Sequence, residues 1–150
     1  MKKIVSILCF ILLGFSCSDE TPRFTVPFAP VNFRVDVGGL DHQLNGALSY
    51  KVFTENDVRT QLDRLGYGGL LLVRDHQASA LFAYDLSCPY EDQRNITLTP
   101  SDDGKAVCKT CGSVFVTMYG LGSVEAGPSQ EPLQRYSVIP QSNGVFIVRN

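Results

Sequence analysis

The chain has 150 residues, of which 44% are hydrophobic, and its 13 basic and 15 acidic side chains give a formal net charge of −2 at pH 7. This length and composition suit a domain built around one hydrophobic core. A mildly acidic chain lacks the basic footprint of a nucleic-acid-binding protein, so we expect no nucleic-acid partner.

The first residues are typical of an export signal and not of a folded domain. Two lysines precede the apolar stretch Ile4–Leu13, which is too short to span a bilayer. The next residues, Gly14-Phe15-Ser16-Cys17, resemble the cleavage site of a bacterial lipoprotein signal, in which Cys17 becomes the lipidated first residue. The pair Asp19-Glu20 resembles the export tag of surface lipoproteins in the Bacteroidetes.

These features predict an outer-membrane lipoprotein of the bacterial cell envelope, facing the periplasm or the outside and attached to the membrane by its lipid. A plain cleaved signal and an uncleaved anchor are the alternatives. Residues 1–16 hold two of the basic and none of the acidic side chains, so the remainder has a formal charge of −4. Residues 17–30 contain Pro22, Pro27 and Pro30 and suit an extended tether, which places the domain at residues 31–150.

The domain reads as a series of short strands. Phe33, Val35 and Val37 alternate with polar residues, which is the period of a half-buried strand. The run Leu70–Val73 is apolar enough to be buried on both faces. The remaining predicted strands are Ser49–Phe53, Ala80–Asp85, Ser113–Met118, Tyr136–Ile139 and Val145–Arg149.

Only residues 56–65 offer a helical pattern. Val58, Leu62 and Leu65 would share one face of such a helix, but the segment fits a loop equally well. Many short strands with Gly, Pro and Asn at the turns predict the all-β class, as an antiparallel sandwich or barrel.

The cysteines carry most of the functional information. Cys9 and Cys17 belong to the export signal and the lipidation site, so the domain keeps Cys88, Cys108 and Cys111. A thiolate is both a soft metal ligand and a redox group. In an oxidising compartment, an odd number of cysteines implies a metal, or one disulfide with a spare thiol.

Two cysteine segments and a third downstream segment together resemble a Rieske iron–sulfur domain. Cys88-Pro89-Tyr90 and Cys108-Lys109-Thr110-Cys111-Gly112-Ser113 are separated by seventeen residues, and Gly127-Pro128-Ser129 follows. The family has Cys-x-His and Cys-x-x-His-Gly-Ser on two hairpin tips, followed by a Gly-Pro loop. The resemblance covers residues 68–149 and implies a sandwich or barrel in which two hairpin loops form the cluster site. It also implies that Gly112, Ser113, Gly127 and Pro128 support those loops.

Both positions at which the family has histidine are changed in this chain. Tyr90 stands at the first and Cys111 at the second. Neutral imidazoles keep the potential of a Rieske centre high, so their replacement by anionic ligands would make the centre harder to reduce. Tyr90 is a poor ligand at neutral pH because the pKa of a phenol lies near ~10.

Three outcomes for the thiols follow from the resemblance. The favoured one is a metal-free domain, because only three good ligands are visible; Cys88 and Cys108 would then form a disulfide. The second is a zinc site with Cys88, Cys108 and Cys111 as ligands, and the third is a [2Fe–2S] centre completed by an unusual ligand.

Other side chains add little to this site. His76 is expected in a surface turn far from the cysteines, and His42 in an exposed loop. Glu91 and Asp92 follow Tyr90 closely and could supply oxygen ligands, although acidic side chains on a loop are usually only solvated. No catalytic constellation is visible, so we expect a protein that is not an enzyme.

Two functional hypotheses result. The first is electron transfer through a metal centre, with a redox partner docking at the loop tips. The second is a cluster-free structural or binding module that keeps the scaffold and uses a disulfide.

Overall fold

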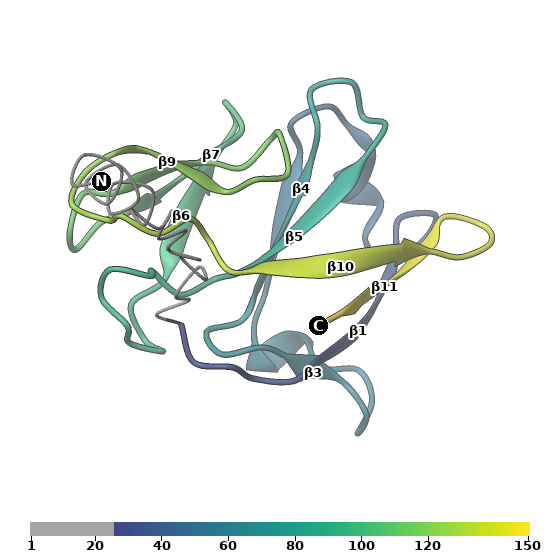
Figure 1. Cartoon of the computed structure of the whole chain (residues 1–150). Coiled ribbons are helices and arrows are strands. Elements are labelled where there is room, and N and C mark those ends of the chain that lie inside the picture. The colour runs from purple at the N-terminus through teal and green to yellow at the C-terminus, as the bar shows by residue number, and fades with distance from the viewer. Residues whose placement is uncertain (1–25) are drawn as a thin grey trace, which may run out of the picture.

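The computed structural model describes residues 26–150, which form an all-β structure. Seven antiparallel strands curl into a nearly closed, barrel-like sheet in the order β2-β4-β5-β10-β11-β1-β3, and a four-stranded antiparallel sheet, β6-β7-β8-β9, lies beside it (Figure 1). The strands of the larger sheet are β1 (Val31–Asp36), β2 (Tyr50–Phe53), β3 (Arg64–Leu65), β4 (Leu70–Arg74), β5 (Leu81–Asp85), β10 (Arg135–Pro140) and β11 (Val145–Arg149).

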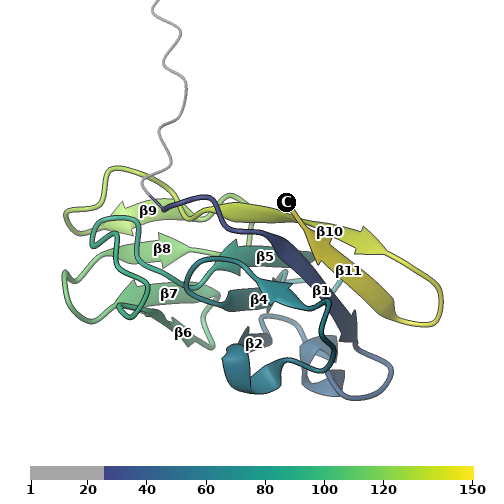
Figure 2. The same cartoon turned by 90° about the horizontal axis from the view of Figure 1, so that it is seen from below.

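The smaller sheet is formed by the chain that follows Cys88, and Cys108 is the last residue of its second strand. Its strands are β6 (Leu98–Ser101), β7 (Lys105–Cys108), β8 (Val114–Val116) and β9 (Ser123–Ala126). Two short 3-10 turns, η1 (His42–Asn45) and η2 (Glu55–Asp57), connect strands of the larger sheet. The smaller sheet lies on one side of the molecule and β10, β11 and β1 of the larger sheet lie on the other, with β4 and β5 of the larger sheet in the middle (Figure 2).

Two hydrophobic cores share β4 as a common wall. Leu70 and Leu72 pack into the first core, inside the curled sheet, whereas Leu71 and Val73 pack into the second core, against the smaller sheet. Every residue of β4 is buried. The prediction that this run is buried on both faces is therefore confirmed, and the alternation of side chains along a strand explains it. The second core also contains Cys88 and Cys108, so the cysteines are part of the packed interior.

The predicted all-β class is confirmed, and each predicted strand matches a strand of the structure to within a few residues. The helical alternative for residues 56–65 is wrong. Only the turn η2 and the two-residue β3 form there, and Val58 and Leu62 are exposed, so no helical face is buried. The strands β6, β7 and β9 were not predicted, because each has a single aliphatic residue larger than alanine: Leu98, Val107 and Val124 respectively.

Two buried carboxylates organise the larger sheet. Asp41 accepts hydrogen bonds from Arg59, from Lys51 and from the backbone N–H of Asp36, at 2.7 to 3.0 Å. Asp85 accepts from the backbone N–H groups of residues 67, 68 and 87 and from the hydroxyls of Ser87 and Tyr136. Because Ser87 precedes the first cysteine, the Asp85 network fixes the chain where it enters the cysteine site.

The expected export signal, the lipidation site Cys17 and most of the tether lie outside the described residues. Within residues 26–150, no helix is long and apolar enough to cross a membrane.

Candidate metal centre

Cysteine loop 1 (residues 88–96) links β5 of the larger sheet to β6 of the smaller one. An antiparallel bridge between Ser87 and Thr97 closes its neck. Inside the neck, the N–H of Cys88 donates to the carbonyl of Ile96 at 3.1 Å, and the N–H of Asp92 donates back to the carbonyl of Cys88 at 3.2 Å. Cys88 is therefore held by its backbone on both sides, and its side chain is fully buried.

Cysteine loop 2 (residues 108–113) is the hairpin tip between β7 and β8. The N–H of Cys108 donates to the carbonyl of Ser113 at 2.9 Å, and the N–H of Gly112 donates to the carbonyl of Cys108 at 2.9 Å. Gly112 adopts a φ of 78°, a conformation that glycine reaches without strain. This tight turn brings Cys111 back over Cys108, which is itself fully buried.

The two loops bring three cysteine sulfurs together. The sulfurs of Cys88, Cys108 and Cys111 all lie within 4.8 Å of one another, and the sulfurs of Cys88 and Cys111 are 3.7 Å apart. None of the three forms a disulfide in this structure. Three cysteines this close together could hold a metal ion, because two sulfurs bound to one tetrahedral metal at ~2.3 Å lie ~3.8 Å apart.

A third loop, which follows β9, supports cysteine loop 2. Gly127 has a φ of 95° and packs so closely that an added Cβ would lie 2.4 Å from the Cα of Ser113. Two residues later, the N–H of Ser129 donates to the hydroxyl oxygen of Ser113 at 3.1 Å. That oxygen also lies 3.2 Å from the sulfur of Cys111, so the third loop orients the group that contacts the Cys111 thiol.

The thiols differ in their electrostatic surroundings. Burial raises the pKa of the Cys88 thiol to about 12, so Cys88 is protonated at neutral pH when no cation is present. Burial also raises the pKa of Cys111, but hydrogen bonds from Ser113 and the neighbouring cysteines outweigh that effect and leave this pKa below its ordinary value. A bound metal would have to displace at least the Cys88 proton.

The other side chains predicted near the site are those of Tyr90, Glu91 and Asp92. Tyr90 is 55% exposed and borders a shallow cavity of about 230 Å³ with Pro89 and Pro128. Among the described residues, no carboxylate or imidazole lies close enough to extend the cysteine group, which leaves Glu91 and Asp92 outside it.

The histidines lie away from the cysteine group. His76 is in the exposed turn between β4 and β5, with its ring 6.0 Å from that of Tyr119, so its predicted surface position is confirmed. His42 is exposed at the start of η1, and its Nδ1 lies 3.2 Å from the carbonyl oxygen of Gly39.

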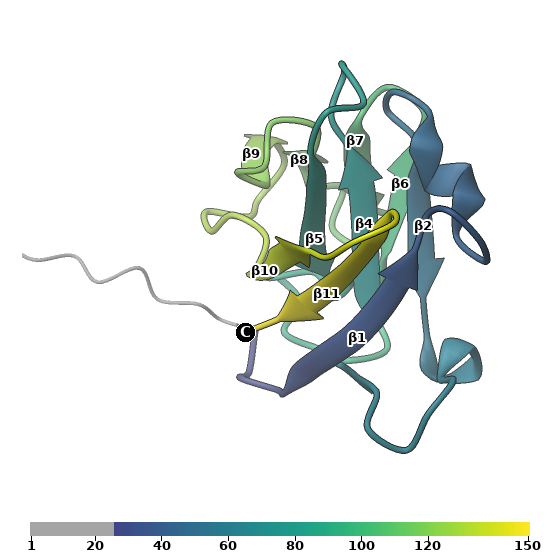
Figure 3. The ribbon, with the colours of Figure 1, turned by 90° about the vertical axis from the view of Figure 1, so that its right-hand side faces the viewer.

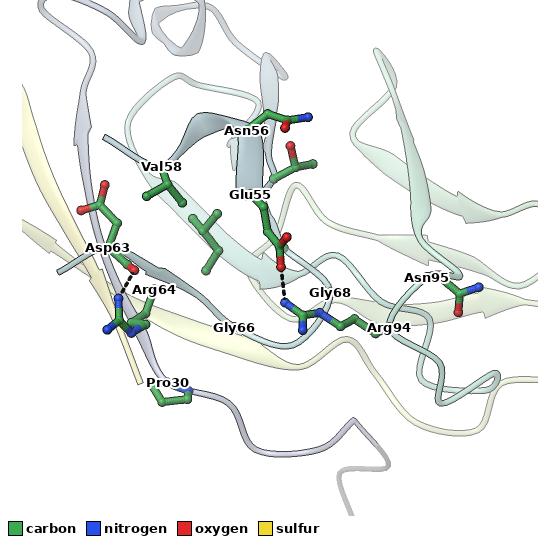
Figure 4. Close-up of a pocket in the computed structure, with 13 residues that line it drawn as sticks. Pro30, Glu55, Asn56, Val58, Asp63, Arg64, Gly66, Gly68, Arg94 and Asn95 are labelled. Carbon is green, nitrogen blue, oxygen red and sulfur yellow. Dashed lines mark hydrogen bonds and ion pairs between the residues drawn. The ribbon is translucent and has the colours of Figure 1, made fainter. Parts of the chain in front are cut away.

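A larger cavity, of about 870 Å³, lies between η2, β3 and cysteine loop 1. Arg94 of cysteine loop 1 reaches across it to Glu55 at 2.6 Å, and Arg64 and Asp63 line the opposite side (Figure 4). Both members of the Arg94–Glu55 pair are exposed, so the pair adds little to stability. It nevertheless links cysteine loop 1 to the larger sheet.

The sequence reasoning did not find the role of Ser129, whose backbone N–H orients Ser113. A backbone donor leaves no mark in residue type, so only the fold reveals it.

No protein-family model matches this chain, and no curated protein sequence matches it significantly.

Proposed function

We propose that this chain is an envelope lipoprotein with a Rieske-like β domain whose cluster site has become a three-thiolate site for one metal ion. The carrying observation is that the sulfurs of Cys88, Cys108 and Cys111 lie within 4.8 Å of one another. The protein would not be an enzyme. The metal would join two loops that leave different sheets, so its first effect would be to fasten those sheets together.

The sulfur spacing favours one metal over a two-iron cluster. Sulfurs on a single tetrahedral ion are ~3.8 Å apart, close to the 3.7 Å between Cys88 and Cys111. Any pair near the 4.8 Å limit of the set would close by about 1 Å when the ion binds. Ligands on the two irons of a [2Fe–2S] cluster are farther apart, because both irons separate them. A set of three sulfurs with no mutual distance above 4.8 Å therefore suits a mononuclear site.

The ligand chemistry favours zinc. Thiolates are soft ligands, and Zn²⁺ takes tetrahedral sites rich in cysteine. Three thiolates on Zn²⁺ carry a net charge of −1, and the hydroxyl of Ser113 beside Cys111 is placed to stabilise part of that charge. Electron transfer to a partner would instead require a redox-active ion such as iron in the same site.

Metal analysis of the full-length protein, purified anaerobically from membranes, tests the proposal. We expect about one zinc per chain, retained in the exposed β10 variant Ser137→Ala and lost in Cys88→Ser, Cys108→Ser and Cys111→Ser. Addition of Co²⁺ to the metal-free protein should give thiolate-to-cobalt absorption with the same dependence on these variants.

Two other results would contradict a mononuclear zinc site. Two irons with two acid-labile sulfides per chain would show a [2Fe–2S] centre and support electron transfer. A metal-free protein with one free thiol in the domain would show the disulfide module. Peptide mapping would then identify the bond, which the sequence predicts as Cys88–Cys108; Cys88–Cys111, with its sulfurs 3.7 Å apart, is the other pairing to distinguish.

A further inference from the structure

The outer face of one half of the larger sheet is basic. Residues that pair across antiparallel strands share a face, so Arg64 of β3, Asn32 of β1, Arg149 of β11 and Ser137 of β10 form one row. The alternating positions of the same strands complete this basic face: Arg34, Asp36, Val145, Ile147, Arg135 and Ile139.

The basic face points to solvent. Its four arginines are exposed, as is Ile139 at 41%, whereas the intervening residues Phe33, Val35 and Val148 are buried in the first core. Asp36 is the one acidic residue at these positions, and it pairs with Arg34 at 3.3 Å. The face is therefore net positive, although the whole chain is net negative.

The described chain begins beside this face. Residues 26–29 line a cavity of about 290 Å³ with Gln134, Tyr136 and Asn150. The Asn150 side chain donates to the carbonyl of Ala29 at 3.1 Å and accepts from the N–H of Val31 at 2.6 Å. Phe28, next to this contact, is 83% exposed. Figure 3 looks onto β10, β11 and β1, with the first described residues and the C-terminus together at one end of these strands.

We propose that the basic face rests on an anionic membrane surface, with Phe28 at the lipid interface. The inference depends on the lipid anchor at Cys17 that forms part of the proposed function. The nine residue steps from Cys17 to Val26 can span at most about 30 Å, so the anchor keeps the adjacent face close to the bilayer. At that distance a weak attraction suffices to orient the domain, because the anchor makes the contact intramolecular. Arginines attract anionic headgroups within about one Debye length, ~8 Å at physiological salt.

Tryptophan fluorescence can test this orientation, because the chain contains no tryptophan. Ser137→Trp places a reporter on the basic face, and Thr99→Trp places a matched reporter at an exposed position of β6 in the other sheet. The full-length lipidated protein is reconstituted in vesicles of brominated phosphatidylcholine with phosphatidylglycerol. We expect quenching of Ser137→Trp at least about twofold stronger than that of Thr99→Trp.

Charge reversal separates the basic face from a general effect of charge. Adding Arg135→Glu and Arg149→Glu should remove the excess quenching, whereas Lys105→Glu on β7 should leave it in place. Equal quenching of the two reporters overturns the proposal, and it is the result expected if the basic face binds an acidic protein and does not touch the membrane. Stronger quenching of Ser137→Trp that persists after the double reversal also overturns it.

The anchor and the metal are measured separately in the same preparation. Mass spectrometry of the N-terminal peptide reports acylation of Cys17, and an unacylated chain overturns the membrane orientation. The fluorescence comparison does not depend on metal content, so it remains a valid test of the membrane orientation even if the metal-site proposal is wrong.

Discussion

The buried carboxylate centre at Asp41 and the buried cysteine centre differ in how many partners the chain supplies to each. Asp41 in the larger sheet has two cationic partners and a backbone donor from the chain itself. The three sulfurs at the end of the second core contact one another and Ser113, and the Cys88 sulfur also accepts from the backbone N–H groups of Glu91 and Tyr90. A buried carboxylate must be paired to be tolerated, whereas neutral thiols can be buried like small apolar groups.

The comparison shows how each centre depends on its surroundings. Asp41 holds a fixed charge and so requires fixed partners in the same chain. The cysteine centre can remain neutral while its thiols are protonated, and a bound cation would displace those protons. The first centre therefore contributes to stability from the chain alone, and on the proposed function a cation would add to the stability of the second.

The largest expected effect comes from breaking the complete centre. Asp41→Asn should destabilise the domain by about 2–4 kcal/mol, because two cations lose their partner. This value is below the usual cost of breaking a fully buried pair, since Lys51 and Arg59 keep 18% and 28% of their side-chain exposure. Denaturant unfolding measures the change, and Asp102→Asn in the exposed turn before β7 is the control. A loss below about 0.5 kcal/mol would contradict this account.

The same residue predicts how stability depends on pH. Burial raises the pKa of Asp41, but hydrogen bonds from Arg59, the Asp36 N–H and Lys51 outweigh it and leave the pKa below the ordinary 3.8. A carboxyl with a lowered folded pKa stabilises fully above its unfolded pKa and loses this contribution as pH falls through the folded value. The free energy of unfolding should therefore fall more steeply between about pH 5 and pH 2 in the wild type than in Asp41→Asn, and denaturant unfolding at each pH measures the difference.

Metal removal should have the next largest effect. Zinc at a hundred times its dissociation constant should stabilise the domain by about 2.7 kcal/mol, and chelation should reverse this. Because Cys88 has a pKa of about 12, zinc must displace its proton, so affinity should fall as pH falls. Thermal unfolding with and without chelator measures the effect, and Cys88→Ser should show no response. A chelator response that persists in Cys88→Ser would place the metal elsewhere.

Two glycines with similar backbone conformations should respond differently to alanine. Gly112→Ala adds strain at φ 78° but meets no atom within 4 Å, so a loss of about 1 kcal/mol is expected. Gly127→Ala adds strain at φ 95° and a Cβ 2.4 Å from the backbone of Ser113, so a loss of about 2–3 kcal/mol is expected. Unfolding of the metal-free proteins compares them. Equal losses would show that the third loop does not pack tightly on cysteine loop 2.

The smallest effect should come from Ser113→Ala. The variant loses the group between Cys111 and the Ser129 N–H, which leaves a buried donor without its partner and costs about 1 kcal/mol. It also removes hydrogen bonding that lowers the pKa of Cys111, so alkylation of Cys111 in the metal-free protein should require a higher pH. The pH profile of alkylation measures this, with Ser137→Ala as the control. An unchanged profile would show that Ser113 does not act on the thiol.

Particular residues show what could be predicted from the sequence. The alternation of Phe33, Val35 and Val37 and the apolar run of β4 require burial wherever the chain folds, so those strands could be predicted. In contrast, β9 is mostly exposed, and β3 is a two-residue strand defined by its pairing with β1. Strands of this kind owe their position to neighbours and carry no local apolar signal.

The candidate site also has features that the sequence predicts and features that only the fold reveals. The sequence by itself determined the residue types: three thiols in two short loops, a serine at the end of the second loop and glycines at the turns. Only the tertiary structure decided that the sulfurs of Cys88 and Cys111 lie 3.7 Å apart, that Ser129 holds Ser113, and that four separated arginines form one face. Those relations depend on strand register and on backbone contacts between distant segments, and neither leaves a local pattern in the chain.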